Sequence, residues 1–293
     1  MRHTLENDVL RIEVEDHGAE LRAITEKADG TEYLWNGDPA WWKYSSPVLF
    51  PIVGKLAGNK YRFGGREYEL PSHGFGRLSD FACTREATDE LIFRLDWSEE
   101  TMRSYPFKFR LEIAYILKLD RVKVMWTVKN LDSDGPMYFS IGAHPALRCP
   151  IMEGEDFTDC YLSFNVEEKC ERILLDSSGS LSRNRVPVLD GKELPLDYAL
   201  FREDALVFDG LHSDEVSIRS RKSAKSVTVR AKGFPFWGFW TPVKGGAPFL
   251  CIEPWYGHAD YVDLKGELSE KDGIQKLAPK ESFDAGYSII IGK

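Results

Sequence analysis

Residues 107–119 have the sequence FKFRLEIAYILKL, in which every odd position from Phe107 to Leu119 is apolar. Charged residues occupy most of the positions between them, as at Lys108 and Arg110. Successive side chains of a β-strand point to opposite faces of the sheet, so this alternation is typical of a strand with one buried face. The segment therefore predicts a long, half-buried β-strand.

The alternation resumes after Asp120-Arg121, with Val122, Val124, Trp126 and Val128 as the apolar set. Two alternating runs joined by a short turn predict an antiparallel hairpin. Similar runs are found at residues 10–15, 91–97, 215–219, 226–231 and 287–291, with Gly-containing turns along the chain. Because amphipathic helical periodicity is scarce, the chain is predicted to be all-β with antiparallel strands.

No internal repeat, low-complexity tract or Pro/Ser-rich linker divides the sequence. Residues 153–200 show the weakest alternation, and residues 176–180 (DSSGS) are predicted to form a surface loop within that section. β-Sandwiches and barrels routinely exceed the usual domain size as one unit. Residues 1–293 are therefore expected to form a single domain.

The chain has 47 acidic and 38 basic residues, a formal net charge of −9, and 43% hydrophobic residues. This composition is typical of a globular protein and offers no excess of positive charge for nucleic acid. No segment approaches the roughly 20 apolar residues that cross a bilayer, and the N-terminus lacks the apolar core of a signal peptide. The five cysteines lack a C-x-x-C pair, which favours free thiols over disulfides or zinc ligands. A cytoplasmic protein with no nucleic-acid or membrane partner is predicted.

Three short segments, 71–77, 141–146 and 251–260, interrupt the strand pattern with ionisable residues among Gly, Pro and aromatic residues. His73 and His144 could exchange protons under cellular conditions, because the ordinary pKa of imidazole lies near neutrality. Glu253 follows an apolar run, which predicts a carboxylate at the end of a buried strand, where burial would raise its pKa and make it a stronger base. The pattern alone favours ordinary turn and strand-end roles for each residue taken singly.

Several motifs, in their order along the chain, resemble those of the aldose 1-epimerase family, in particular its LacX-like branch. They are SPVLFPIVG at 46–54, GGREYEL at 64–70, HGFGR at 73–77, His144-Pro145, and Glu253-Pro254-Trp255. The resemblance runs nearly end to end, and the order of the motifs is more specific than any one of them. It implies a large antiparallel β-sandwich of the galactose mutarotase-like supersandwich type, with the site in a groove across one sheet.

The resemblance implies an aldose 1-epimerase (mutarotase), which interconverts the α and β anomers of a hexose. It implies Glu253 as the general base on the anomeric hydroxyl and His144 as the general acid on the ring oxygen, with His73 and Asp204 binding the sugar. Together these two proton transfers open the ring. Because neither electrons nor groups are transferred, no metal or other cofactor is expected. The base and the acid are expected on opposite sides of the sugar, a pyranose-width apart.

Three further residues are candidate sugar-binding groups. Lys55 stands where the family commonly has an arginine, and lysine lacks the planar fork of a guanidinium. Arg77 could contact the sugar or a phosphate, as basic residues of this region do in the related hexose-6-phosphate epimerases; an ion pair with Asp80 is an equally supported alternative. Trp240 is expected to stack on the sugar ring, whereas Trp42 is expected only to pack.

Two alternatives remain open beside a mutarotase. One is a hexose-6-phosphate 1-epimerase, and the other is a non-catalytic carbohydrate-binding protein of the same fold. A β-sandwich lyase or glycosidase is disfavoured, because glycosidases normally need two carboxylates and only Glu253 presents itself. His258 and Asp260 lack a further clustered ligand, so they do not predict a metal site.

Overall fold

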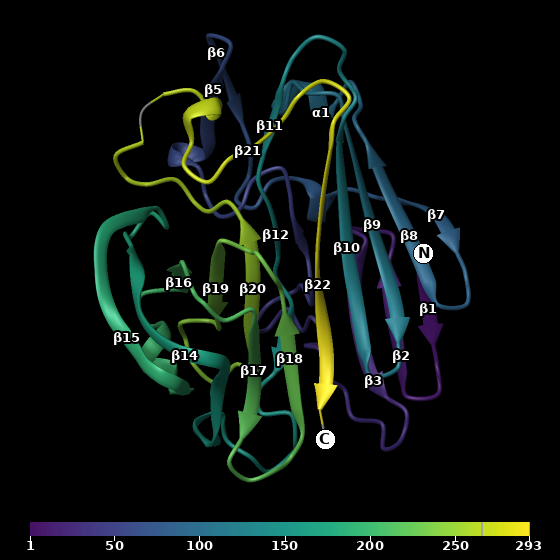
Figure 1. The fold of residues 1–293 in the computed structure, drawn as a ribbon, viewed down its shortest axis with the longest axis vertical. Coiled ribbons are helices and arrows are strands. Elements are labelled where there is room, and N and C mark those ends of the chain that lie inside the picture. Colours follow the sequence, from purple (N-terminus) through teal and green to yellow (C-terminus); the bar gives the residue numbers. More distant parts are fainter. Residues whose placement is uncertain (265, 293) are drawn as a thin grey trace.

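The computed structural model describes residues 1–264 and 266–292, whose secondary structure is almost entirely antiparallel β-strand (Figure 1). The largest sheet in these residues has 15 strands. Its hydrogen-bonded order is β4 (Val48–Leu49), β12 (Ile141–Ala143), β20 (Phe249–Tyr256), β19 (Phe236–Trp240), β16 (Leu206–Asp209), β14 (Cys160–Leu175), β17 (Glu215–Ser220), β18 (Ser226–Arg230), β22 (Ser282–Gly292), β10 (Arg121–Asn130), β9 (Phe109–Lys118), β8 (Glu90–Asp96) and β7 (Ala82–Glu86). β13 (Ala146–Arg148) pairs with β20, and β15 (Leu181–Pro195) pairs with β14.

Three smaller sheets accompany the large one. The first is β1 (Arg2–Glu6), β2 (Leu10–Glu15) and β3 (Glu20–Glu26); the others pair β11 (Met137–Phe139) with β21 (Gln275–Leu277) and β5 (Lys60–Phe63) with β6 (Arg66–Glu69). The α-helix α1 (Thr101–Ser104) and 3-10 helices at Ala57–Asn59, Gly76–Leu78, Phe157–Asp159, Tyr198–Phe201 and Leu268–Glu270 complete the described elements. No helix in this part of the chain has the length and apolarity needed to cross a membrane.

The hairpin predicted from residues 107–128 is confirmed, since β9 and β10 pair along their whole length. Its turn lies at Leu119-Asp120, one residue earlier than expected, because Arg121 already pairs with Lys118. β2, β8, β17, β18 and β22 also coincide with predicted alternating runs. The all-β, antiparallel fold predicted from these patterns is therefore the observed one.

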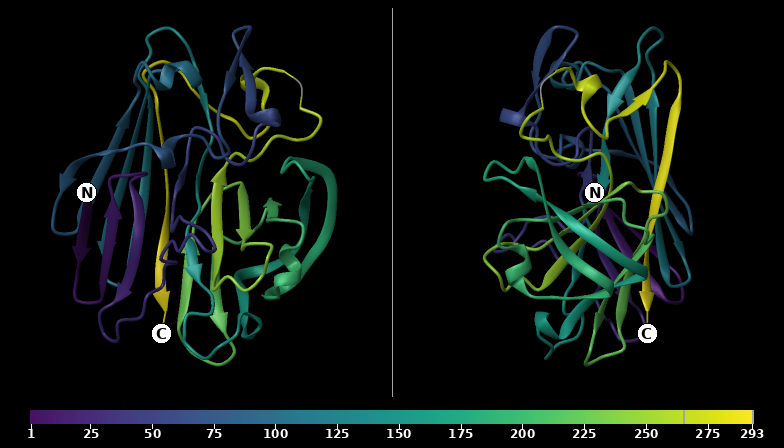
Figure 2. Two further views of the ribbon diagram at one scale, coloured as in Figure 1. Left: turned by 180° about the vertical axis from the view of Figure 1, so that it is seen from behind. Right: turned by 60° about the vertical axis from the view of Figure 1, so that its left-hand side comes forward.

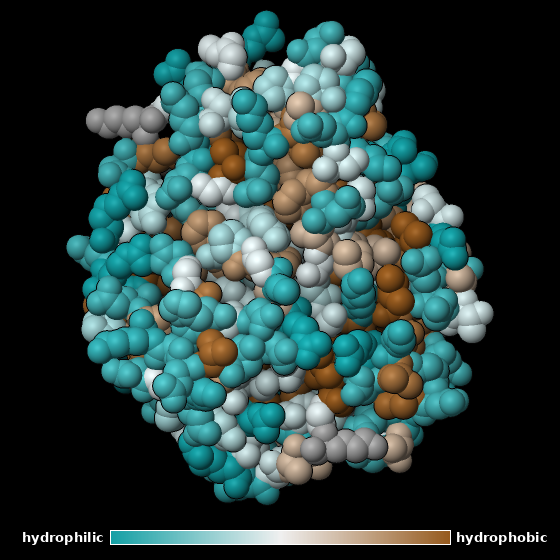
Figure 3. Space-filling view, viewed as in Figure 1, coloured by the Kyte–Doolittle hydropathy of each residue, from teal (hydrophilic) through white to brown (hydrophobic). Residues whose placement is uncertain are grey.

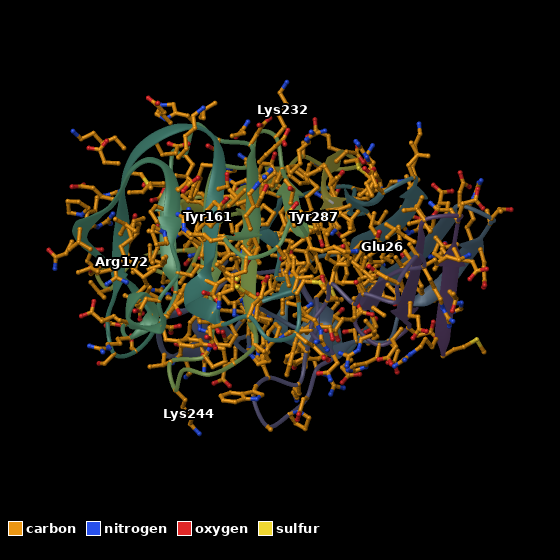
Figure 4. The ribbon with its side chains drawn as sticks, turned by 90° about the horizontal axis from the view of Figure 1, so that it is seen from below. Glu26, Tyr161, Arg172, Lys232, Lys244 and Tyr287 are labelled. Carbon is orange, nitrogen blue, oxygen red and sulfur yellow. The ribbon has the colours of Figure 1, made fainter. Side chains whose placement is uncertain are left out.

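The core lies between the large sheet and the sheet β1–β3, which is placed beside strands β7–β10 (Figures 1 and 2). The alternating apolar residues of β9 and β10 form one cluster with those of β1–β3. Tyr115 of β9 also donates its hydroxyl to the carbonyl oxygen of Ala19 at 2.6 Å. Figure 4 shows Tyr287 in the interior, between Glu26 on the β3 side and Arg172 on the β14 side. Outside this core, the face in Figure 3 is mainly hydrophilic, with scattered apolar patches.

The weakly alternating section at 153–200 contains the long curved hairpin β14–β15 rather than mainly irregular structure (Figure 1). Its register shifts between Ser163 and Glu168, between Cys170 and Glu171, and between Ile173 and Leu175. A shift of register moves the following side chains to the other face of the sheet. The alternation of apolar and polar residues is therefore interrupted in the sequence. Residues 176–180, predicted as a loop, form the turn of this hairpin.

Candidate active site

A cavity of about 600 Å³ lies beside β12, β20, β19 and β16. All of the residues predicted from the sequence to bind or transform a sugar line it: Lys55, His73, Arg77, His144, Asp204, Trp240 and Glu253. They come from loops after β4 and β6, from the end of β12, from the approach to β16, and from β19 and β20. The structure therefore brings residues from distant parts of the chain to one concave site.

Glu253 lies within β20, not at the end of a strand as expected, because pairing continues to Tyr256. β20 is buried on both faces except at its last residue, which accounts for its apolar sequence. Leu250 and Ile252 point into the main core, whereas Glu253 has the opposite parity and lines the cavity. The strand thus aims a carboxylate that is 1% exposed at the cavity.

His144 directly follows β12, and its Nε2 lies 3.3 Å from Oε2 of Glu253. The two groups are therefore in direct contact on one side of the cavity, closer than the pyranose-width separation expected from the chemistry. The expectation overlooked that the anomeric hydroxyl and the ring oxygen are bonded to the same carbon, so neighbouring groups can reach both. Glu253 Oε2 and His144 Nδ1 are both buried, and neither makes a hydrogen bond to another described residue.

Burial pushes both members of this pair towards their neutral forms. It raises the pKa of Glu253 well above its ordinary value; the nearby indole of Trp255 opposes this shift and the charge of Asp204 reinforces it. Burial lowers the pKa of His144 well below its ordinary value, with smaller effects from His73 and Arg77. The pair therefore tends to hold one proton between its two members around neutrality.

His73 has a defined tautomer. Its Nδ1 accepts a hydrogen bond from the backbone N–H of Gly54 at 3.2 Å, so in the neutral ring the proton is on Nε2. Burial lowers the pKa of His73 to about 3, with a further contribution from Arg77. Its ring lies edge-on to His144 with centroids 5.5 Å apart. His73 is thus a neutral N–H donor beside the His144–Glu253 pair.

Tryptophan side chains wall the cavity. Trp42 lies 4.6 Å from His144 between ring centroids, and Trp240 lies 5.7 Å from it. The expectation that Trp42 only packs was wrong, because Trp42 lines the cavity itself. No local pattern separates such a loop residue from a core residue, since its position depends on contacts with distant strands.

Trp255 lies across its two neighbouring strands. A Cβ added at Gly142 would lie 2.5 Å from Trp255, and one added at Gly238 would lie 2.3 Å from it. These two glycines stand inside β12 and β19, where glycine often marks a close approach. The sequence already made Trp255 a candidate wall residue, because it lies beside Glu253, and these glycines account for the space that its indole occupies.

The three more polar candidates, Asp204, Arg77 and Lys55, line the rest of the cavity. Asp204 is exposed, and its carboxylate accepts a hydrogen bond from the N–H of Ala205 at 2.9 Å. Arg77 donates to the carbonyl oxygen of Ser72 and lies over the ring of Tyr44. The alternative ion pair between Arg77 and Asp80 is not formed, because Asp80 instead contacts His17 at 2.8 Å.

Asp260, which sequence reasoning set aside, holds three walls of the cavity together. Its backbone N–H donates to the carbonyl oxygen of Lys55 at 2.9 Å, and its carbonyl accepts from Leu181 at 2.8 Å. Its carboxylate accepts from the N–H of Ala57 at 2.9 Å and from Nζ of Lys271 at 2.7 Å. The Asp260–Lys271 pair is buried, with exposures of 3% and 2%. Its partners are all distant in sequence, so no local motif reveals it.

His144, Cys251 and Glu253 place one potential ligand atom each within 4.8 Å of one another and could hold a metal ion. Arg77 acts on His144 with a positive charge, which disfavours a second cation there. Acid–base chemistry by the paired carboxylate and imidazole is what this arrangement most directly supports.

A buried carboxylate–imidazole pair in a tryptophan-walled cavity on an antiparallel β-fold is the arrangement of an acid–base site. The family model for aldose 1-epimerases matches residues 1–274, and this chain belongs to that family. It is 34% identical to the chromosomal protein LacX of Lactococcus lactis subsp. lactis, over 98% of each chain. The structure of a galactose mutarotase related enzyme from Lactobacillus acidophilus is 34% identical, with a TM-score of 0.96 over 100% of this chain and 98% of that one. A galactose mutarotase-like protein from Lactobacillus casei is 27% identical, with a TM-score of 0.93 over 99% and 100%.

Proposed function

We propose that this protein is a mutarotase that interconverts the α and β anomers of a hexose. The observation that carries the proposal is the 3.3 Å contact between His144 Nε2 and Glu253 Oε2 at the wall of one cavity. Membership of the aldose 1-epimerase family supports the class of reaction. The names of the compared galactose mutarotase-related proteins support a hexose as the substrate.

In the proposed reaction, the single proton of the pair moves from Glu253 to His144, so the carboxylate of Glu253 can accept the proton of the C1 hydroxyl while His144 donates its proton to the ring oxygen. The bond between C1 and the ring oxygen breaks, and a free aldehyde forms. Rotation about the C1–C2 bond presents the other face of the aldehyde. The oxygen of the C5 hydroxyl then attacks the aldehyde carbon and closes the ring. Glu253 returns its proton to the aldehyde oxygen while His144 recovers the proton of the C5 hydroxyl, so both groups are reset. Each positioned proton transfer contributes about 10²- to 10⁴-fold in rate.

The surrounding residues support this chemistry in distinct ways. His73 would donate from Nε2–H to a sugar oxygen, and Asp204 would accept from a hydroxyl. Trp240 and Trp255 would cover the apolar C–H surface of the ring, and Lys55 would contact hydroxyls at the opening. Such fixed contacts orient the sugar for proton transfer.

Polarimetry on freshly dissolved α-glucose and α-galactose tests the proposal. The wild type is expected to accelerate equilibration, and Glu253→Gln to remove about 10²- to 10⁴-fold of that acceleration. Glu168→Gln is the matched control, because Glu168 is also a buried carboxylate, 2% exposed, but lies outside this cavity. An unchanged rate in Glu253→Gln would reject Glu253 as the base. Sugar binding without acceleration by the wild type would instead identify a carbohydrate-binding protein.

A second candidate is an epimerase of hexose 6-phosphates, and Arg77 favours it. Its Nε has no hydrogen-bond partner among the described residues, and burial lowers its pKa. A half-buried cation that forms no ion pair with a carboxylate of the described residues would be stabilised by an anionic group on the ligand. Lys55, at the same cavity, would add a second positive charge.

We further infer a cytoplasmic location. Cys83, Cys149, Cys160, Cys170 and Cys251 are all free thiols, which fits a reducing compartment.

A further inference from the structure

A second cluster of ionisable side chains lies far from the cavity in the fold, where β1 and β7 come side by side (Figures 1 and 2). His3 belongs to β1, whereas Cys83 and Glu86 belong to β7, the edge strand of the large sheet. One potential ligand atom from each of these three residues lies within 4.8 Å of the other two. None of the three residues lines the sugar cavity.

The ring of His3 is held on both sides. Its Nδ1 lies 3.1 Å from Oε2 of Glu86, and its Nε2 lies 2.8 Å from Oδ1 of Asp16. The ring packs edge-on against Phe93, with centroids 5.3 Å apart, and is 8% exposed. A histidine that ligates a metal typically places its other nitrogen on a carboxylate, which fixes the tautomer and the ring orientation. Asp16 occupies that position here.

A β-bulge creates the cluster. Cys83 and Glu86 are three residues apart, so in a regular strand their side chains would point to opposite faces. The pairing of β7 with β8 shifts register between Cys83 and Arg85, which inserts one extra residue and brings the two side chains to a common side. Bulges are local departures that re-aim side chains at the edges of sheets, and this one directs a thiol and a carboxylate at His3.

The three potential ligands are a thiol, a carboxylate and an imidazole, and the adjacent carboxylate of Asp16 also pairs with the N-terminal amine at 2.8 Å. A divalent cation bound by a thiolate, a carboxylate and a neutral imidazole forms a complex with no net charge. Sulfur, nitrogen and oxygen ligands in this combination suit zinc-like cations, and three protein ligands leave a fourth position for water.

We propose that His3, Cys83 and Glu86 form a binding site for a thiophilic divalent cation of the zinc class, with Asp16 orienting His3. The cation connects the sheet β1–β3 to the edge of the large sheet. This site is independent of the sugar cavity and of the reaction proposed there.

Titration of the metal-free, reduced protein with Co²⁺ tests the site, because a cobalt–thiolate bond has a charge-transfer absorption. The wild type is expected to bind one equivalent with this absorption, and Zn²⁺ to displace it. Cys83→Ser should abolish the band, and Glu86→Gln should weaken binding. Asp16→Asn should keep the stoichiometry and weaken binding by about 10- to 100-fold. Cys170→Ser is the matched control, since Cys170 is another half-buried thiol outside the cluster.

Mutarotation by Cys83→Ser should be unchanged, so failure of the metal site and failure of the proposed activity are distinguishable. A band that persists in Cys83→Ser, or that is lost in Cys251→Ser, overturns the proposal, because the metal would then occupy the group beside Glu253. Absence of the band in the wild type overturns it as well. Circular dichroism of each variant verifies that the fold is retained.

Discussion

His144 and Glu253 contact each other through Nε2 and Oε2 at 3.3 Å, although 109 residues (253 − 144) separate them in the sequence. β12, which carries His144 at its end, pairs directly with β20, which carries Glu253. Adjacent strands of one sheet therefore position the proposed acid and base. Rigid elements place catalytic groups more accurately than mobile loops do.

Replacement of His144 by asparagine is expected to lower kcat more than it raises KM. Asparagine keeps a polar group in the site but cannot donate a proton to the ring oxygen as an acid, so the loss should be about 10²- to 10⁴-fold in kcat. Saturation kinetics by polarimetry measure both parameters. His212→Asn, at a side chain that is 80% exposed, is the control. A rise in KM at constant kcat would reassign His144 to binding.

The pH dependence of kcat/KM should be broad. With the ordinary pKa values of 4.5 for Glu253 and 6.5 for His144, the pair would hold a single proton only between pH 4.5 and pH 6.5. Because burial raises the pKa of Glu253 and lowers that of His144, the one-proton state should extend above pH 6.5 and below pH 4.5. We expect a nearly flat profile that extends beyond pH 4.5–6.5 on both sides after correction for buffer catalysis. A maximum confined to pH 4.5–6.5 would contradict the shifts.

Arg77→Met distinguishes the two substrate candidates. If the ligand carries a phosphate, the substitution should lower kcat/KM for glucose 6-phosphate about 10- to 100-fold more than for glucose, because a charged hydrogen bond is lost. Arg85→Met, at an exposed arginine that pairs with Glu90, is the control. Equal losses for the two sugars would assign Arg77 to hydroxyl binding or to the wall of the cavity.

Gly238→Ala should displace Trp255. The added methyl would lie 2.3 Å from the indole, so either the side chain or the strand must move. Overpacking of this kind typically costs about 1–3 kcal/mol in the free energy of unfolding. Denaturant titration and sugar binding measure the two effects. Gly135→Ala is the control, because an added Cβ there meets no atom within 4 Å, and it should leave both stability and sugar binding unchanged. Unaltered stability in Gly238→Ala would show that the indole of Trp255 is free to move.

The substitution Asp260→Asn should remove the negative charge that pairs with the buried Lys271. Removing one partner of a buried ion pair typically lowers the free energy of unfolding by about 3–5 kcal/mol, and the double variant with Lys271→Met should recover part of this loss. KM should rise, because Asp260 connects three walls of the cavity. Asp190→Asn, in an ion pair that is 80–86% exposed, is the control. Additive effects of the two substitutions would show that the pair is not coupled.

The sequence predicted the strands whose pairing is regular, but it did not predict the strands that are interrupted by bulges. Alternation in residues 107–128 was sufficient for β9 and β10, whereas the bulges of β14 and β15 removed the same signal. The residues with family motifs that line the cavity, such as His73 and Glu253, were named from the sequence as site candidates, and their roles stay predictions. Trp42 and Asp260 were not, because their positions depend on contacts between distant segments that no local pattern records.

The turn of the β14–β15 hairpin reaches the cavity, where Ser177, Ser178 and Gly179 form part of its lining. Two backbone hydrogen bonds, Leu181 to Asp260 and Val262 to Leu181, fasten it there without using its side chains. Within the turn, Asp176 accepts hydrogen bonds from the backbone N–H groups of Ser178 and Ser180, whereas the side chain of Ser177 makes none of these bonds. Ser177 can therefore be replaced while the turn, the sheet and the proposed proton-transfer pair stay intact. Selectivity for different sugars could thus evolve separately from the chemistry, by substitution in one short turn.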